Sequence, residues 1–364
     1  MKIRNITDYL EEIAPLHLQE SYDNSGLIIG DLENIVQGCL ITLDCTEEVI
    51  DEAVSKKCNL IIAHHPIIFN PLKKIIGNSY VERTIIKAIK NDIAVYAIHT
   101  NLDNVYGGVN SKIAEKLGLI NCEILLPKNK FLKQLVVYCP LTHSEALKEA
   151  MLDNGAGSFT NYDNCSFSSN GQATFRPKEG SSPFVGDIGE IYDSKEVRLE
   201  FFLEKDTENS LIKLMQENHP YEQVAYQIYT LDNFSHDIGS GMIGDLSSEI
   251  ESEIFMNFIK KQMHTDCIRH TQLINKQIKR VAICGGSGSF LLQQAKNKKA
   301  DIFISSDFKY HEFFDADKKI IIADIGHFES EQFTKELIYD FLRKKFTKFA
   351  VQLSNVNTNP INYL

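Results

Sequence analysis

The sequence contains no tryptophan, no C-x-x-C pair and no apolar run near the roughly 20 residues that a membrane-spanning helix requires. Its eight cysteines are scattered, which argues against a disulfide framework and against a cysteine-bound zinc ion. Positive charge is also scarce, because 38 lysines and arginines face 49 acidic residues and leave a net charge of −11. Nucleic-acid binding depends on cations that contact phosphates, so this balance argues against a nucleic-acid partner.

The length of 364 residues, with 43% hydrophobic and 24% charged residues, is typical of a globular protein with two or three domains. The first residues become acidic and amphipathic at once, unlike a secretory signal. Together with the scattered cysteines, this predicts a cytoplasmic protein without a membrane segment.

Short apolar runs alternate with amphipathic segments in the first and last thirds of the chain. Such runs predict buried strands of a mixed, largely parallel sheet with helices on both faces. The expected strands lie at 40–43, 59–63, 93–98, 280–284, 301–305 and 319–323. The middle of the chain has a β-α-β…β-α-β order, which is typical of a ferredoxin-like α+β domain. The sequence therefore predicts an α/β domain formed by residues 1–128 and 233–364, interrupted by an inserted ferredoxin-like domain at 129–232.

Polar side chains follow two neighbouring strands of the expected sheet. His64 and His65 follow the strand at 59–63, and Asp103 lies just beyond the strand at 93–98. Ligands of open α/β sheets bind at the carboxyl ends of the strands. Neighbouring side chains of an extended chain point in opposite directions, so adjacent histidines suit two neighbouring ions better than one. Taken alone, each pattern also fits a structural role, such as surface histidines or a helix-capping aspartate.

A third polar pattern opens the helix that follows the strand at 319–323. His327 and Glu331 are four residues apart, so they share one face of that helix. Three strand ends together offer three histidines and two carboxylates, a set that suits Zn²⁺, Mn²⁺ or Fe²⁺. Two ions about 3.5–4 Å apart are usually bridged by a carboxylate, and Glu331 is the expected bridge. We therefore predict two divalent metal ions per chain, with zinc as the first candidate.

Two further histidines are candidates for catalytic proton transfer. His99 precedes Asp103 at the same strand end and could be a ligand, a proton carrier or a partner of a ligand. His311 follows the strand at 301–305 and so lies at the same edge by the same argument. The glycine-rich stretch 284–288 could hold a phosphate through its amides, or it could form a plain tight turn.

Several short motifs occur in order along nearly the whole chain. They are DNSGL at 23–27, HHP at 64–66, HTNLD at 99–103, GAG at 155–157, YDNCSF at 162–167, HPYE at 219–222, GSGMIG at 239–244, CGGSG at 284–288 and HFESE at 327–331. With these motifs the sequence resembles the GTP cyclohydrolase 1 type 2 homologue family, the Nif-three-like dinuclear-metal proteins.

The resemblance implies a set of ligands and an assembly. His65 and Asp103 would bind one ion, His64 and His327 the other, and Glu331 would bridge both. The chain would form a toroidal homohexamer whose sites face an inner cavity. The inserted domain would be similar to the small trimeric signalling-protein fold.

Two positions depart from the family pattern. The chain has Ser305-Ser306-Asp307 where the family usually has Thr-Gly-Asp, and Tyr22 where the family often has tryptophan. Loss of the glycine could alter the loop near the metals, whereas the change at Tyr22 is expected to be tolerated. Neither position is an expected ligand.

The resemblance also implies a reaction. A dinuclear metal-dependent hydrolase would open the guanine ring of GTP by attack of water at C8, with a purine nucleotide as the small-molecule substrate and formate as a product. The same ligand set also suits a two-metal phosphoester hydrolase. A non-catalytic protein that stores, delivers or senses metal, or that serves as a regulatory scaffold, fits the same residues.

Overall fold

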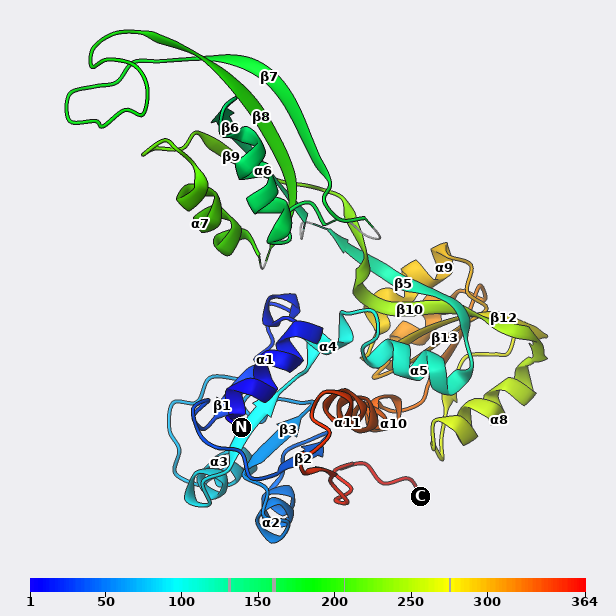
Figure 1. The fold of residues 1–364 in the computed structure, drawn as a ribbon. Helices are drawn as coiled ribbons and strands as arrows, with labels where there is room; N and C mark the ends of the chain where they lie inside the picture. Colours follow the sequence, from blue (N-terminus) through cyan, green and yellow to red (C-terminus); the bar gives the residue numbers. More distant parts are fainter. Residues whose placement is uncertain (130–131, 159–161, 206, 275) are drawn as a thin grey trace. The chain divides into compact units, whose positions relative to one another are not determined.

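The structure is a computed structural model that describes residues 1–129, 132–158, 162–205, 207–274 and 276–364. The chain divides into two compact units. Met1–Pro127 and Asp237–Leu364 form unit 1, and Lys128–His236 form unit 2 (Figure 1). Among the described residues, no helix combines the length and the apolar character that crossing a membrane would require.

The first sheet of unit 1 has five strands in the order β1-β4-β3-β2-β15. Four of them run parallel, and β1 pairs antiparallel with β4. The strands are β1 (Gly26–Ile29), β2 (Cys39–Thr42), β3 (Leu60–Ala63), β4 (Ala94–Ala97) and β15 (Val351–Leu353). Every residue of β2, β3 and β4 is buried, as expected of apolar strands that are covered on both faces.

The second sheet of unit 1 has six strands in the order β11-β14-β13-β12-β10-β5. β12, β13 and β14 run parallel, whereas β10 and β11 each pair antiparallel with a neighbour. The strands are β5 (Ile120–Asn129), β10 (Phe234–Glu251), β11 (Arg269–His270), β12 (Gln277–Ser287), β13 (Ile302–Ser306) and β14 (Ile321–Asp324). The predicted α/β class with mixed sheets is confirmed.

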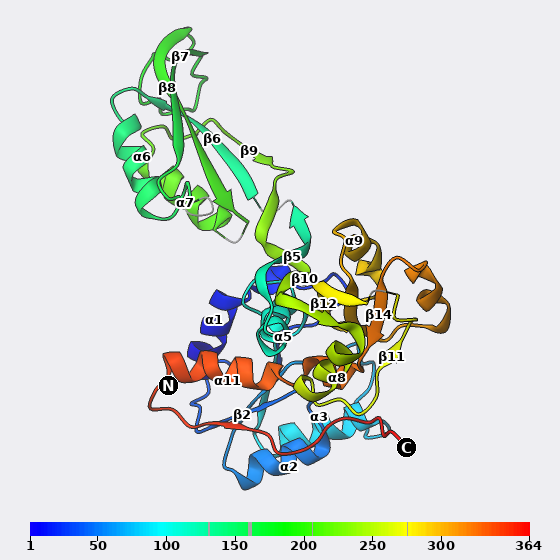
Figure 2. The same ribbon diagram turned by 90° about the vertical axis from the view of Figure 1, so that its right-hand side faces the viewer.

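The helices of unit 1 cover these sheets (Figures 1 and 2). One hydrophobic core joins α2 and α3 to β2, β3 and β4, and another joins α9 to β12, β13 and β14. The helices are α1 (Ile3–Ile13), α2 (Glu47–Ser55), α3 (Tyr80–Lys90), α4 (Thr100–Asp103), α5 (Val109–Leu117), α8 (Ser252–Gln262), α9 (Leu292–Asn297), α10 (His327–Glu331) and α11 (Thr334–Lys345). Three short 3₁₀ segments accompany them: η1 (Leu16–Leu18), η2 (Ser289–Leu291) and η3 (Tyr310–Ala316).

Unit 2 contains a four-stranded antiparallel sheet in the order β7-β8-β6-β9. Its strands are β6 (Leu132–Pro140), β7 (Ser166–Phe175), β8 (Tyr192–Glu204) and β9 (Tyr226–Thr230), and its helices are α6 (Ser144–Asp153) and α7 (Glu208–Asn218). Leu147 and Met151 of α6 join Leu211 and Met215 of α7 in one core with the strands. Unit 2 therefore has a hydrophobic core of its own.

The register of the first sheet brings three strand ends together. Thr42 at the end of β2 pairs with Ala63 at the end of β3, and Ala63 pairs with Ala97 at the end of β4. Because these strands are parallel, the residues that follow them leave the sheet at one edge. This edge positions the polar side chains described next.

Candidate metal centre

His64 and His65 directly follow β3, and their amides donate hydrogen bonds to carbonyl groups at the end of β2. Their side chains diverge toward opposite neighbours. His64 is fully buried, and its Nδ1 lies 2.8 Å from the carbonyl oxygen of Ile98 at the end of β4. His65 turns toward β2, where its Nδ1 lies 2.8 Å from Oδ1 of Asp44. Each imidazole therefore keeps Nε2 for another partner.

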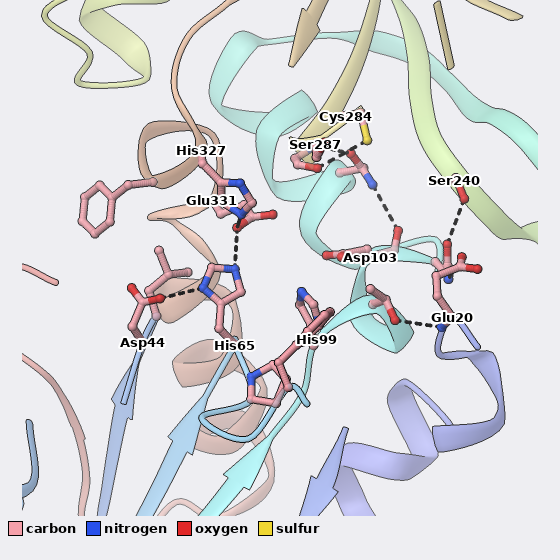
Figure 3. A pocket seen from close by; sticks show the side chains of 18 of the residues that line it. Glu20, Asp44, His65, His99, Asp103, Ser240, Cys284, Ser287, His327 and Glu331 are labelled. Atoms are coloured by element: carbon pink, nitrogen blue, oxygen red, sulfur yellow. Dashed lines mark hydrogen bonds and ion pairs between the residues drawn. The ribbon is translucent and has the colours of Figure 1, made fainter. Parts of the chain in front are cut away.

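Helix α10 brings two more side chains to this edge. It begins after Gly326, whose φ of 92° favours glycine and lets the chain turn sharply out of β14. Glu331 is buried, and its Oε2 lies 3.0 Å from Nε2 of His65 and 3.1 Å from Nε2 of His327. Its Oε1 lies 3.9 Å from Nε2 of His64. Figure 3 shows Glu331 directed at the ring of His65.

The potential ligand atoms form groups whose members all lie within 4.8 Å of one another. One group contains His64, Asp103 and Glu331, and another contains His65, His327 and Glu331. Nε2 of His64 and Oδ1 of Asp103, 3.6 Å apart, are buried and have no hydrogen-bond partner among the described residues. Two such atoms are costly to bury, and a divalent cation between them would satisfy both. The donor set therefore fits a metal.

This grouping differs from the ligand pairing that the family resemblance implied. His64 groups with Asp103 and His65 with His327, rather than His65 with Asp103 and His64 with His327. The cause is the direction of the two rings. His64 faces the end of β4, and α4, which carries Asp103, follows that strand directly. His65 faces Asp44 and the side chains of α10.

His99 lies beside both groups and has its own carboxylate partner. Its Nδ1 lies 2.7 Å from Oδ1 of Asp23, while Oδ2 of Asp23 accepts hydrogen bonds from the amide and the hydroxyl of Thr100. His99 forms a third group with His64 and His65. Asp23 belongs to the motif at 23–27. The sequence alone did not identify this aspartate as a partner of His99.

The charge of Glu331 shifts the pKa values of its neighbours: it favours protonated imidazoles and opposes a second carboxylate. Burial alone would lower the pKa of His65, but hydrogen bonds to Asp44 and Glu331 outweigh it and raise that pKa to about 10. The charge of Glu331 is the main cause that raises the pKa of His327 to about 11. Burial, followed by repulsion from Glu331, raises the pKa of Asp103 to about 7. In the metal-free protein His65 and His327 thus hold protons that a cation must displace.

A cavity of about 510 Å³ opens above these groups. Its lining includes His65, Asp103, His327 and Glu331, but not His64. Aromatic side chains also line it, among them Tyr22, Phe69 and Phe290, which are 64%, 46% and 64% exposed. The rings of Tyr22 and Phe69 lie beside each other, with centroids 6.1 Å apart. The cavity therefore combines polar groups with apolar surfaces that a flat ligand could contact.

The glycine-rich stretch 284–288 borders the cavity as the irregular end of β12, where the pairing with β13 shifts register between Ile283 and Ser287. The amide of Gly285 donates to Oδ1 of Asn110, and the amide of Gly286 donates to Oγ of Ser330. Two of the amides that a phosphate would need are therefore already engaged. Gly286 has a φ of +62°, and a Cβ atom there would lie 2.4 Å from Oε1 of Glu331. The absence of a Cβ atom at Gly286 therefore leaves space for the side chain of Glu331.

Gly286→Ala is therefore expected to displace Glu331 and to weaken metal binding, measured by chelator competition. Gly107→Ala is the matched control, because Gly107 also has a positive φ, of +85°, but a Cβ atom there would meet nothing within 4 Å among the described residues beyond its chain neighbours. Both variants should lose roughly 1–3 kcal/mol of stability from backbone strain. Unchanged metal affinity in Gly286→Ala would contradict this account of Gly286.

Two expectations concern the chain around the end of β13: an altered loop at Ser306, and a position of His311 at the same sheet edge as the ligands. Asp307 follows β13, and its Oδ2 lies 2.6 Å from Nδ1 of His327. Ser306, which replaces the usual glycine, lies within β13 and has no positive φ, so its backbone does not require glycine and the loop still delivers Asp307. Its buried hydroxyl has no hydrogen-bond partner among the described residues. His311 is exposed in η3, where its ring contacts Tyr310 and Phe314, outside the cavity as the described residues form it.

Comparison with known proteins gives matches along the whole chain. Residues 1–360 match the family described as Duf34/NIF3 (NGG1p interacting factor 3). A Bacillus subtilis protein named GTP cyclohydrolase 1 type 2 homolog is 38% identical over 367 residues, which cover 99% of this chain and 98% of that protein. The crystal structure of a Bacillus cereus protein related to NIF3 is 38% identical, with a TM-score of 0.85 over 100% of this chain and 99% of that one. A Staphylococcus aureus protein of known structure is 31% identical, with a TM-score of 0.81 and the same coverage.

Proposed function

Since the chain belongs to the Duf34/NIF3 family, we propose that it is a dinuclear metal-dependent hydrolase that opens the guanine ring of GTP. The support that matters most is the pair of buried atoms without a partner, Nε2 of His64 and Oδ1 of Asp103. Glu331 belongs both to the group that contains this pair and to the group that contains His65 and His327. A bridging carboxylate requires this arrangement. His64, His65, Asp103, His327 and Glu331 are the proposed ligands.

The proposed chemistry divides between the ions and the chain. Two bound divalent ions would supply Lewis acidity and lower the pKa of a water molecule from 15.7 toward about 7. His99 is our candidate for proton transfer, because Asp23 binds its Nδ1 and leaves Nε2 for a substrate. Asp44 and Asp307 orient His65 and His327 in the same way, each through Nδ1. His311 lies outside the cavity and is not assigned this role.

The substrate proposal rests on the walls of the cavity. A guanine ring could lie against Tyr22 and Phe69, and the relatives' name refers to GTP. Among the described residues that line the cavity there is no lysine or arginine, so the ions alone would offset the charge of the phosphates. This last feature also leaves room for the second candidate, a metal-binding or regulatory scaffold without turnover.

Further parts of the proposal concern the metal, the assembly and unit 2. We propose zinc, with manganese or iron as alternatives, because histidine and carboxylate ligands without cysteine suit all three. We also propose a toroidal homohexamer in the cytoplasm, and the eight free cysteines support a reducing compartment. The strand order β7-β8-β6-β9 with two helices supports an inserted ferredoxin-like domain over 129–232.

Formate release tests the reaction. Protein loaded with Zn²⁺ or Mn²⁺ should release formate from GTP, and this release should stop when a chelator removes the metal. His99→Ala should lower the rate by roughly 10²–10⁴-fold, the usual contribution of a positioned acid or base. His311→Ala is the matched control and should leave the rate unchanged. Phosphate release from p-nitrophenyl phosphate without formate would indicate a phosphoester hydrolase, and metal binding without either product would indicate a scaffold.

A further inference from the structure

Residues 354–364 follow β15 without forming a helix or strand, yet they are fixed to the edge of the sheet that carries the metal centre (Figure 2). The amide of Ser354 donates to the carbonyl oxygen of Ile41 in β2, and its hydroxyl donates to Glu52 of α2. The amide of Asn355 donates to the same carboxylate. These contacts guide the segment along β2 toward its carboxyl end.

At that end, Asp44 joins the segment to the metal centre. The hydroxyl of Thr358 donates to Oδ2 of Asp44 at 2.6 Å, and Oδ1 of the same carboxylate lies 2.8 Å from Nδ1 of His65. Both oxygens of Asp44 are thus engaged, one by the segment and one by the imidazole. A carboxylate held at both oxygens cannot rotate away from the ring that it orients.

The next residue makes a second connection, to α10. Nδ2 of Asn359 donates to Oε1 of Glu329 at 3.0 Å, and Glu329 lies between His327 and Glu331 in the same short helix. Asn359 also lines the cavity, together with Pro360 and Ile361. The segment therefore contacts Asp44, the partner of His65, and α10, which carries His327, and it forms part of the cavity wall.

We propose that Thr358 is a positioning residue for the His65 and His327 half of the metal centre, acting through Asp44. The inference rests on the proposed function, since it concerns the same ions. By fixing Asp44, Thr358 keeps the proton of His65 on Nδ1 and leaves Nε2 directed at Glu331 and the ion. No comparable contact reaches His64 from this segment among the described residues, because its Nδ1 is held by a backbone carbonyl that follows β4. The two halves of the centre should therefore respond differently to a change at Thr358.

The test is the substitution Thr358→Val, which replaces the hydroxyl by a methyl group of similar size. The affinity of the full chain for Zn²⁺, measured by chelator competition, should fall by roughly 10–100-fold for one ion and change little for the other. In a His64→Ala background, which leaves only the His65 and His327 group, Thr358→Val should weaken the remaining ion. In a His327→Ala background it should not.

Two controls separate positioning from general attachment of the segment. Thr358→Ser keeps a hydroxyl and should restore the affinity of the parent protein. Ser354→Ala removes one of the segment's two hydrogen bonds to Glu52, and the one that the Ser354 hydroxyl accepts from the amide of Val356, without touching Asp44. It should leave both affinities unchanged. The inference fails alone if Thr358→Val binds both ions normally, or if Ser354→Ala weakens them equally. A parent protein that binds no zinc would end the proposed function and the inference together, whereas zinc binding without turnover would end only the hydrolase.

Discussion

Replacement of Glu331 by glutamine is expected to abolish tight binding of both metal ions in one step. Glu331 is the only residue shared by the group with Asp103 and the group with His327, as the described residues form them. Its side chain is only 3% exposed, so solvent cannot replace the lost negative charge. Because removal of a partner around a ligand already costs 10–100-fold in metal affinity, loss of the shared ligand should exceed about 100-fold for each ion.

The measurement for Glu331→Gln is the zinc content of the purified full chain, together with chelator competition. Glu329→Gln is the matched control, since Glu329 lies two residues away in α10 and is also buried, at 6% exposure, but belongs to neither ligand group. Its amide oxygen can still accept the hydrogen bond from Asn359. If Glu331→Gln retains both ions, a bridging role for this carboxylate is ruled out.

Two double substitutions should separate the pairing seen in the structure from the pairing that the family resemblance implied. His64→Ala with Asp103→Asn removes two members of one group, so the protein should keep one of its roughly two ions. His64→Ala with His327→Ala removes one member from each group and should lose both. The alternative pairing predicts the opposite result for each variant.

Metal analysis after gel filtration provides the readout for these variants. Thermal unfolding in the presence and absence of zinc gives a second one, because an ion at 1,000 times its dissociation constant adds about 4 kcal/mol of stability. The first variant should keep part of this stabilisation and the second should lose it. Equal metal contents in the two double variants would contradict any grouping of the ligands into two halves.

The strands that carry the centre could be located from the sequence. The expected strands at 40–43, 59–63 and 93–98 differ by one residue at each differing end from β2, β3 and β4. Continuous apolar runs bounded by polar residues are a strong local signal, and their parallel order places the following residues at one edge. The same reasoning selected the five side chains that the structure brings together.

The strands β5 and β10 were not predicted from the sequence, because the local residue pattern does not indicate a strand at either place. The motif at 239–244 is rich in glycine and resembles a loop, yet it lies inside β10. A Cβ atom at Gly239 would lie 2.3 Å from the carbonyl oxygen of Leu126 in β5, so a glycine is needed where the two strands approach. Only the tertiary structure shows this requirement.

The hydrogen-bond partners of the centre were also beyond the sequence. Asp44 follows β2 at the same edge and could have been selected by the strand-end argument. Its link to Thr358 could not, because the two residues are 314 positions apart. The grouping of the ligands was not predictable for a related reason. It depends on which neighbouring strand each imidazole faces, and alternation along an extended chain does not specify that direction.

The distance along the chain between the two sides of the centre has a consequence for protein synthesis. His65 and Glu331 are 266 positions apart, with the whole of unit 2 between them. At typical elongation rates the ribosome needs on the order of tens of seconds to translate the chain from the tandem histidines to α10. During that interval the nascent chain has His64, His65 and Asp103 but lacks Glu331, the carboxylate that both groups share. Under the proposed dinuclear site, loading would therefore follow translation of α10, and a ribosome that stalls within unit 2 would leave a product without the shared ligand.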